Sequence, residues 1–266
     1  MKGLIPSKPL TRASKVIRRP GCRLPSRCRA LTARASARFQ DTECHLAETK
    51  KELSFLLQSL GYPNTVLPGE ARAKSEIDRV LHRLEALTPA PEPLLWQQQP
   101  GGVPGISPLL LGAWELVYAS NGILVTRTAP AELLRTASRL PGVGLSDISQ
   151  VLSLNSSGSL VASNSAVFGF GPLGSWRVGI EGVWRDSGDG KTARVLFDQV
   201  SIKPDSAMGL PAPSWLPPLR LATGGTSGPG ESRAGAPWIT TFVDRDMRVG
   251  RGKEGEAFLF KRKAPR

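Results

Sequence analysis

Few residues of this chain have the types and spacing that catalysis requires. It has only two histidines, His45 and His82, so a serine nucleophile in the C-terminal two-thirds has no nearby histidine in sequence to act as its base. Residues 169–174 satisfy G-x-G-x-x-G, but Pro172 removes a backbone amide. The residues that follow alternate like a strand, whereas a dinucleotide site requires a helix there. We therefore expect a protein that is not an enzyme and has no cofactor.

Metal ligands and disulfide partners are also scarce. Of the three cysteines, Cys22 and Cys28 lie in the N-terminal segment, and only Cys44 remains in the rest of the chain. Neither histidine has a Cys or His neighbour at metal-ligand spacing beyond the Cys44-His45 dipeptide. We expect no metal site, and no disulfide within a mature monomer.

A cluster of charged side chains lies near the C-terminus. Two arginines three residues apart face opposite sides of a strand, so one is expected to point inward unless Gly250 marks a bulge. That arginine could hold an anionic lipid or quinone headgroup, or tie the last strands to a carboxylate. Because the acids and bases can pair across neighbouring strands, each exposed pair contributing under about 1 kcal/mol, we favour a mainly structural role. The cluster comprises Asp244, Asp246, Arg248, Arg251 and Gly252.

The elements that carry these side chains are predicted to be mainly strands. After Gly112 the hydrophobic period becomes two, and turn-forming residues separate the segments that follow. Eight or nine successive strands predict an antiparallel meander that closes into a barrel, with a sandwich as the alternative. The predicted strands are 114–118, 123–125, 148–154, 160–170, 176–184, 191–202, 238–243, 247–249 and 257–262.

Aromatic residues recur at alternate positions of these strands. The interior of an eight-stranded barrel is either filled by its own side chains or holds one small ligand. The pattern leaves both possibilities open. The hypothetical lining of a ligand-binding barrel comprises Trp114, Tyr118, Phe168, Phe170, Trp176, Trp184, Phe197, Trp238 and Phe242.

Two amphipathic helices are predicted within residues 41–88. Leu53, Leu57 and Leu60 recur at helical spacing, and a second stripe runs from Ile77 to Leu84. Such stripes could form a groove for a partner or a membrane. We favour the interpretation that the two helices pack on each other and on the domain that follows.

Two proline-rich stretches show no periodicity. Residues 89–108 contain six prolines and are typical of a linker, which places the β-domain at 109–264. Residues 203–237 are predicted to form a long loop, and loops of that length are often functional. Trp215 and the residues up to Leu219 could insert into a lipid surface, although we favour a solvent-exposed loop tucked against the barrel.

The net charge of +13 resides mainly in residues 1–38, which hold eleven lysines and arginines and no carboxylate. This segment is rich in Ser, Thr and Ala and lacks the apolar run of a secretory signal, so it is typical of a disordered transit peptide. Its four prolines favour a plastid over a mitochondrion. A disordered basic arm that binds RNA or an anionic surface is the alternative, but no aromatic residue precedes Phe39 to stack on bases. The remaining chain is nearly neutral, and we expect no nucleic-acid partner.

Several segments together resemble the plastid lipid-associated proteins, the fibrillin family. The most specific are the acidic turn and arginine-containing strand at 244–252 and the apolar strand Phe258-Leu259-Phe260 that follows. The first strand at 111–120, the strand at 194–198 and the paired helices also occur in the expected order. The likeness spans roughly residues 46–262, and the glycine-rich insertion near 221–236 departs from it.

This resemblance implies a lipocalin-like antiparallel β-barrel preceded by an N-terminal α-helical hairpin, with no catalytic residues. It further implies a plastid protein, peripheral to thylakoids or plastoglobules. Such a protein binds or sequesters a small lipophilic molecule such as a carotenoid, quinone or acyl lipid. Two alternatives stay open: a structural lipid-droplet coat protein without a ligand cavity, and an enzyme of lipid or isoprenoid metabolism. The enzyme would need polar groups that converge in a roomy cavity.

Overall fold

The computed structural model divides the chain at Glu43 into an N-terminal unit and a larger unit from Cys44 onward. Residues 1–25 of the predicted transit peptide, and the predicted strand 123–125, lie outside the described residues. From Ser26 the predicted disorder is wrong, because helix α1 (Ser26–Leu60) begins directly after the last proline of that segment. The described residues are 26–95, 105–121, 144–171, 174–207, 210–213, 215–222 and 236–264.

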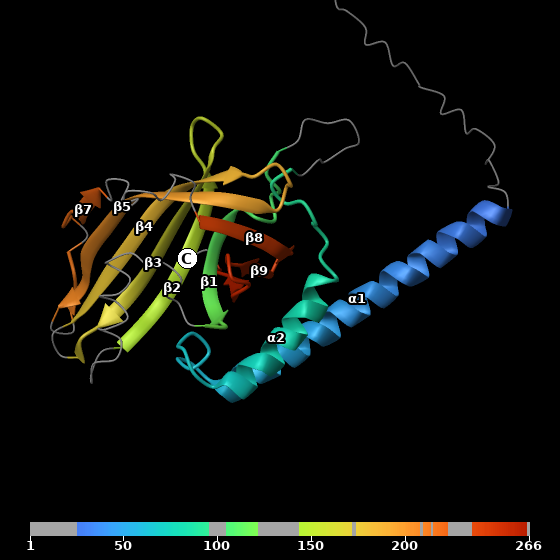
Figure 1. The fold of residues 1–266 in the computed structure, drawn as a ribbon, viewed down its shortest axis with the longest axis horizontal. Helices are drawn as coiled ribbons and strands as arrows, with labels where there is room; N and C mark the ends of the chain where they lie inside the picture. The colour runs from blue at the N-terminus through green and yellow to red at the C-terminus, as the bar shows by residue number, and fades with distance from the viewer. Residues whose placement is uncertain are drawn as a thin grey trace, which may run out of the picture. The chain divides into compact units, whose positions relative to one another are not determined.

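Eight antiparallel strands of the larger unit close into a barrel (Figure 1). The order is β1-β2-β3-β4-β5-β8-β9-β10, and β10 pairs with β1 to complete the ring. The predicted barrel is thus confirmed, and the sandwich alternative is wrong. The strands are β1 (Gly112–Ala119), β2 (Gly144–Leu154), β3 (Leu160–Gly169), β4 (Ser175–Asp186), β5 (Thr192–Ala207), β8 (Ala236–Val243), β9 (Met247–Arg251) and β10 (Ala257–Arg262).

The predicted loop 203–237 is partly sheet. Strand β5 continues through Ala207, and two short strands, β6 (Leu210–Pro211) and β7 (Leu219–Ala222), pair with it outside the ring. Pro211 lies in the two-residue edge strand β6, a position where a missing amide costs little. Strand pairing at an edge therefore overrides the proline-rich composition that predicted a loop.

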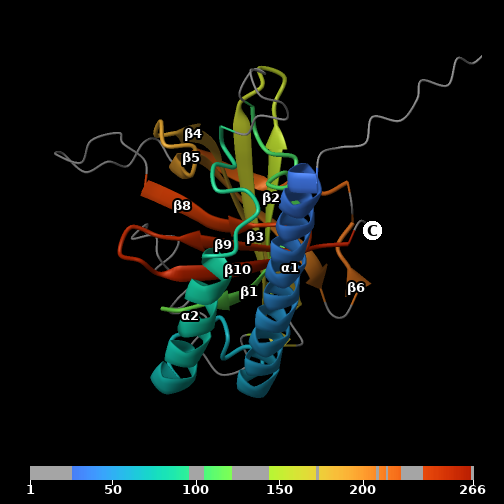
Figure 2. The ribbon, with the colours of Figure 1, turned by 90° about the vertical axis from the view of Figure 1, so that its right-hand side faces the viewer.

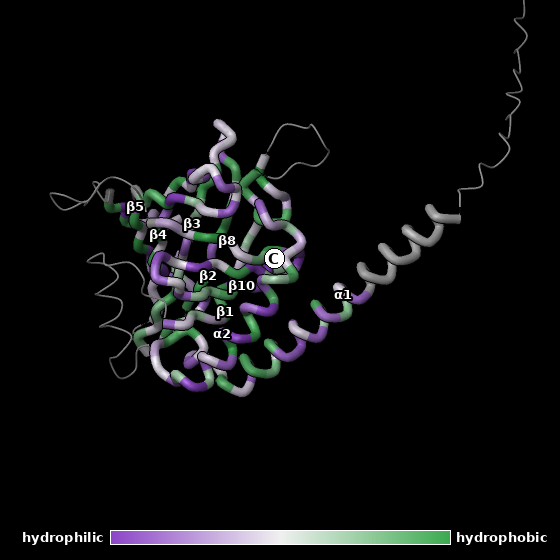
Figure 3. The backbone as a smooth tube through the Cα atoms, turned by 45° about the vertical axis from the view of Figure 1, so that its right-hand side comes forward, coloured by the Kyte–Doolittle hydropathy of each residue, from purple (hydrophilic) through white to green (hydrophobic). Residues whose placement is uncertain are grey.

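The second half of α1 and helix α2 (Ala71–Glu85) cover the outer face of β1, β8, β9 and β10 (Figure 2). Hydrophobic and hydrophilic residues alternate along these elements (Figure 3). The apolar stripes meet in what we term the outer cluster, so the predicted packing of the helices on the domain is confirmed. Its buried members are Leu53, Leu57, Ile77, Val80, Leu81, Leu84, Tyr118, Phe242, Met247, Val249, Ala257 and Leu259. No helix of the described residues is long and apolar enough to span a membrane.

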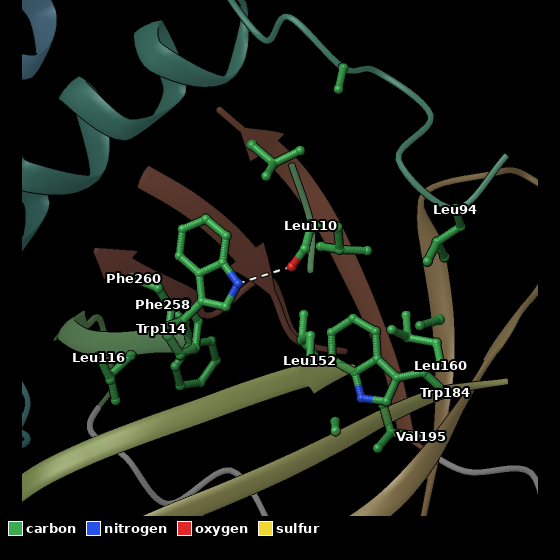
Figure 4. Packing of buried hydrophobic residues seen from close by; sticks show 14 of the residues in the cluster. Leu94, Leu110, Trp114, Leu116, Leu152, Leu160, Trp184, Val195, Phe258 and Phe260 are labelled. Carbon is green, nitrogen blue, oxygen red and sulfur yellow. Dashed lines mark hydrogen bonds between the residues drawn. The ribbon is translucent and has the colours of Figure 1, made fainter. Parts of the chain in front are cut away.

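A second group of apolar side chains, the inner cluster, lies on the inner face of the barrel (Figure 4). Within it the Trp114 Nε1 donates a hydrogen bond of 3.0 Å to the carbonyl oxygen of Leu110. Phe197 and Trp238 are partly buried and pack against it. Its buried members are Val66, Ala90, Leu94, Leu110, Trp114, Leu116, Ala119, Leu152, Leu160, Ala162, Trp184, Ala193, Val195, Val243, Phe258 and Phe260.

The proline-rich segment after α2 packs on the barrel instead of acting as a free linker. Ala90 and Leu94 are buried in the inner cluster, and the Leu94 amide donates to the carbonyl of Gly190 at 2.8 Å. Gly190 has φ +71°, and a Cβ there would lie 2.9 Å from the Cβ of Glu92. The segment therefore lies tightly against the β4–β5 turn.

Candidate functional site

The structure brings four of the nine predicted lining residues together inside the barrel. Trp114 and Trp184 are buried members of the inner cluster, and the partly buried Phe197 and Trp238 pack against this cluster. The ring centroids of Trp184 and Trp238 are 6.2 Å apart, and Trp238 lies 5.0 Å from Phe258. One part of the barrel interior is therefore filled by aromatic side chains.

Tyr118 and Phe242 belong to the outer cluster, so their predicted place in the lining is wrong. Each follows a register shift, between Leu116 and Tyr118 in β1 and between Thr240 and Phe242 in β8. One extra residue reverses which side chains face inward. The Tyr118 hydroxyl donates to the carbonyl of Lys74 at 3.1 Å, and burial raises the pKa of that hydroxyl.

Phe168, Phe170 and Trp176 lie at the other end of the β3–β4 ribbon. Phe168 pairs with Trp176 across the strands, whereas Trp184 pairs with Leu160 at the opposite end. Phe168 is buried, Phe170 is half-buried just beyond β3, and Trp176 is 43% exposed. These three residues therefore do not join the aromatic group around Trp114.

The side chains on the inner face of β4 become more exposed to solvent from Trp184 toward Trp176. Exposure is 4% at Trp184 and 43% at Trp176, and the side chains of Val178 and Ile180 between them are half-buried. Because alternate residues of a strand share a face, all four point to the inner side. The described side chains consequently leave this apolar part of the interior partly accessible to solvent.

The same apolar face continues onto β7. Leu219 pairs with Ile202 and Leu221 with Val200, both of which lie on the inner face of β5. Leu219 and Leu221 are 61% and 48% exposed. Contiguous exposed apolar surface commonly marks an interaction site. We use the term apolar patch for the exposed apolar side chains of β4, β6 and β7 and of the segment between β6 and β7; they are Trp176, Leu210, Trp215, Leu219 and Leu221.

One arginine of the C-terminal cluster points into the barrel. Arg248 is completely buried, with its guanidinium carbon 4.3 Å from the ring centroid of Phe260 and 5.4 Å from that of Trp114. Its Nη2 donates to Oε1 of Gln150, whose Nε2 donates to Oδ1 of Asn164 at 2.6 Å. A polar chain thus crosses the inner face from β9 to β3.

Several buried donors inside the barrel have no partner among the described residues. They are Nε and Nη1 of Arg248, the indole nitrogens of Trp184 and Trp238, and the hydroxyl of Thr240. Burial, with a smaller contribution from Arg262, lowers the pKa of Arg248 to about 9. The guanidinium is therefore still protonated at neutral pH. Buried polar groups are normally satisfied, so this arrangement is suited to receiving an acceptor.

The other residues of the C-terminal cluster form ion pairs and hydrogen bonds within the fold. Arg251 points outward, where its Nε donates to Glu85 of α2 at 2.7 Å. The Asp244 carboxylate accepts the backbone amides of Asp246 and Met247, each at 2.8 Å, which holds the turn before β9. The Gly252 amide donates to the carbonyl of Glu256 at 2.9 Å, which holds the turn after it.

Sequence reasoning missed three polar side chains inside or at the end of the barrel. Gln150 and Asn164 stand among apolar residues that alternate along predicted strands, and that break in the pattern was the available signal. Arg262 lies 4.1 Å from the Trp114 ring centroid and donates to the carbonyls of Leu109 and Leu111 at 2.5 and 2.8 Å. These contacts of Arg262 arise because strand β10 pairs with β1, which the sequence does not show. Within the described part of the chain, no three His, Cys, Asp or Glu side chains form a metal-binding group.

The PAP_fibrillin family model matches residues 56–261. The chain belongs to the PAP/fibrillin family. It is 27% identical over 230 residues to "Probable plastid-lipid-associated protein 3, chloroplastic" of Oryza sativa subsp. japonica. That alignment covers 73% of this chain and 54% of the relative, so the chain spans about half the length of the fibrillin-family relative that it matches.

Proposed function

We propose that this protein binds or sequesters a small lipophilic molecule inside its barrel, without catalysing a reaction. The observation that carries the proposal is the half-buried apolar inner face around Val178, Ile180 and Ile202. A soluble domain normally buries such side chains, and an apolar guest would do so here. Membership of the PAP/fibrillin family and a relative named for lipid association support the same function.

The expected affinity follows from the area that a guest would bury. Burial of about 300 Å² of apolar ligand surface contributes roughly 7 kcal/mol before association costs. That corresponds to weak or micromolar binding. A carotenoid, a quinone or an acyl lipid offers at least this much apolar surface.

The apolar patch suggests where the guest would enter and leave. Leu219 and Leu221 extend the inner face of β5 to the outside, and Trp215 of the same edge is 78% exposed. An exposed edge of this composition can dock on a thylakoid or plastoglobule surface as a peripheral protein does. The guest could then pass between lipid and barrel without crossing water.

A plastid location is part of the proposal. Residues 1–38 have the composition of a transit peptide, and the rice relative carries the word chloroplastic in its name. Import into isolated chloroplasts should shorten the chain by about 4 kDa. Import of a chain that lacks these residues would show that the targeting information lies elsewhere.

A lipid-droplet coat protein is the second candidate, because the apolar patch alone would serve that role. Incubation of the full chain with a chloroplast pigment and lipid extract, followed by mass spectrometry of what co-purifies, separates the two. We expect retained lipid with the wild type and loss of it in Ile180→Trp, which fills the inner face. Val183→Trp, on the opposite face of β4, is the matched control and should retain lipid. A wild-type protein that retains nothing would leave only the coat function.

The apolar patch can be tested separately by flotation with vesicles of plastid galactolipids. The double variant Trp215→Ser and Leu219→Ser should remain unbound, because it removes two exposed apolar side chains of the patch. The same variant should still retain lipid in the co-purification experiment. Flotation equal to that of the wild type would place the docking surface elsewhere.

A further inference from the structure

We infer that the barrel selects a guest with a carboxylate head, such as a long-chain fatty acid anion, and seats that carboxylate on Arg248 with the acyl tail toward the apolar patch. This inference rests on the proposed function and names its ligand class. It concerns a part of the interior where buried hydrogen-bond donors lack acceptors among the described residues.

The charge on Arg248 is the first argument. Its side chain is fully buried, and no described carboxylate forms an ion pair with it. Its polar contact within the described residues is the neutral amide of Gln150. A buried cation without a counter-charge is destabilising, and a single bound carboxylate would compensate it.

The position of the other unsatisfied donors is the second argument. Thr240 pairs with Gly250, the next inward-facing residue of β9 after Arg248. The Trp238 indole occupies the space beside Gly250, where a Cβ would lie 2.3 Å from its ring. The Trp184 ring is 5.9 Å from the guanidinium carbon of Arg248. The donors therefore lie around one region on the inner faces of β4, β8 and β9.

The type of donor selects the head group. All the unsatisfied groups can donate hydrogen bonds, and one of them carries a positive charge, so the match is an acceptor with a single negative charge. A hydrocarbon carotenoid would leave every donor unsatisfied. A phosphate carries more charge than one arginine balances, and the neighbouring Arg262 is already engaged with the carbonyls of Leu109 and Leu111.

The path of the tail follows from the inner face. From Trp184 the face passes Ile180 and Val178 and reaches Trp176 at the apolar patch. At about 3.3 Å per residue this stretch is about 26 Å long, which accommodates a long acyl chain. Gln150, held by Asn164, acts as a positioning residue because it fixes one edge of the guanidinium.

Binding of palmitate and of methyl palmitate to the full chain tests the inference, because the two share a tail and differ in charge. We expect the wild type to bind palmitate at least tenfold more tightly. Arg248→Met should lose that preference, still bind methyl palmitate, and have a ligand-free melting temperature equal to or above that of the wild type. Arg245→Met removes an exposed cation three residues earlier and should keep the preference.

Two further variants keep the test decisive if Arg248→Met does not fold. Trp238→Phe keeps an aromatic ring, although a smaller one, and removes the indole N–H; it should weaken palmitate binding three- to tenfold and leave the binding of methyl palmitate much less affected. Arg248→Lys keeps the charge and should retain part of the preference. Equal wild-type affinity for both ligands would overturn the carboxylate inference and leave the proposed function intact. Absence of binding of either ligand, with no lipid co-purified, would overturn the proposed function itself.

Discussion

Strand β9 carries one arginine on each face, and the two side chains have different partners. Arg251, on the outer face, lies 2.7 Å from Glu85 and 3.5 Å from Asp78, both on helix α2. Arg248, on the inner face, lies among aromatic rings with one amide partner and two unsatisfied nitrogens. The outer-face arginine is thus paired with carboxylates of the fold, whereas the inner-face arginine has no carboxylate partner among the described residues.

The same contrast holds for the other buried donors. In the outer region, Lys74 is buried but donates to the carbonyls of Leu67 and Ala119 at 2.5 and 2.7 Å. Burial lowers the pKa of this lysine. In the inner region the Trp184 and Trp238 indoles have no acceptor among the described residues. Each unmade buried hydrogen bond costs about 1–3 kcal/mol, so stability alone does not explain the inner arrangement.

The largest effect should come from the inner cluster. Trp114→Ala removes a fully buried indole and should lower the free energy of unfolding by about 3–5 kcal/mol. Denaturant titration measures this change. Val151→Ala, at a 43% exposed position on the neighbouring strand β2, should change stability by about 0.5 kcal/mol or less. Similar values for the two variants would mean that the barrel interior is not a packed core.

The ion pair on the outer face should give the next largest effect. Glu85→Ala leaves the largely buried Arg251 with a weaker partner and should cost about 2 kcal/mol. Asp78→Ala removes a partner that is 36% exposed and should cost under about 1 kcal/mol. If the order were reversed, the outer face would not be organised around Glu85.

Tyr118→Phe tests whether Tyr118 belongs to the outer cluster and not to the barrel interior. It deletes the hydroxyl that donates to Lys74 and should cost about 1 kcal/mol in denaturant titration. Lipid retention should not change, because Tyr118 belongs to the outer cluster. If the variant lost lipid and kept its stability, Tyr118 would have to line the barrel interior, and the register shift assigned to β1 would be wrong.

The smallest effect should come from the ion pairs of Asp147. Burial by itself would raise the pKa of the Asp147 carboxyl. Hydrogen bonds from Lys263 and Arg177 have the larger combined effect, so the pKa of Asp147 lies below its ordinary value of 3.8. A carboxylate with a depressed pKa stabilises the fold above its unfolded pKa, and that contribution is lost as the pH falls through the folded pKa. Asp147→Asn should therefore cost under about 1 kcal/mol at pH 7, and this cost should shrink as the pH falls below 3.8. A cost that persisted at the lower pH would mean that the carboxylate charge is not its source.

Much of the fold was predictable, because alternation of apolar residues over successive strands and helical spacing before them are local patterns. The spacing of Arg248 and Arg251 also predicted opposite faces. The bulges before Tyr118 and Phe242 were not predictable, because a strand with one extra residue has the same composition as a regular one. The sequence also gave no sign that Gln150 would be the partner of Arg248, since the two are brought together only by closure of the barrel.

The contact between α1 and the C-terminal turn limits where the proposed transit peptide can end. Lys50 lies 2.5 Å from Asp244, in the turn that precedes β9, and Leu53 of the same helix is fully buried in the outer cluster. A cleavage after Lys50 would remove the cation that pairs with Asp244 and shorten the helix that covers the barrel. A cleavage near residue 38 would leave both intact. Removal of the proposed transit peptide, residues 1–38, would therefore end within the first part of helix α1 and keep the part of the helix that packs on the barrel.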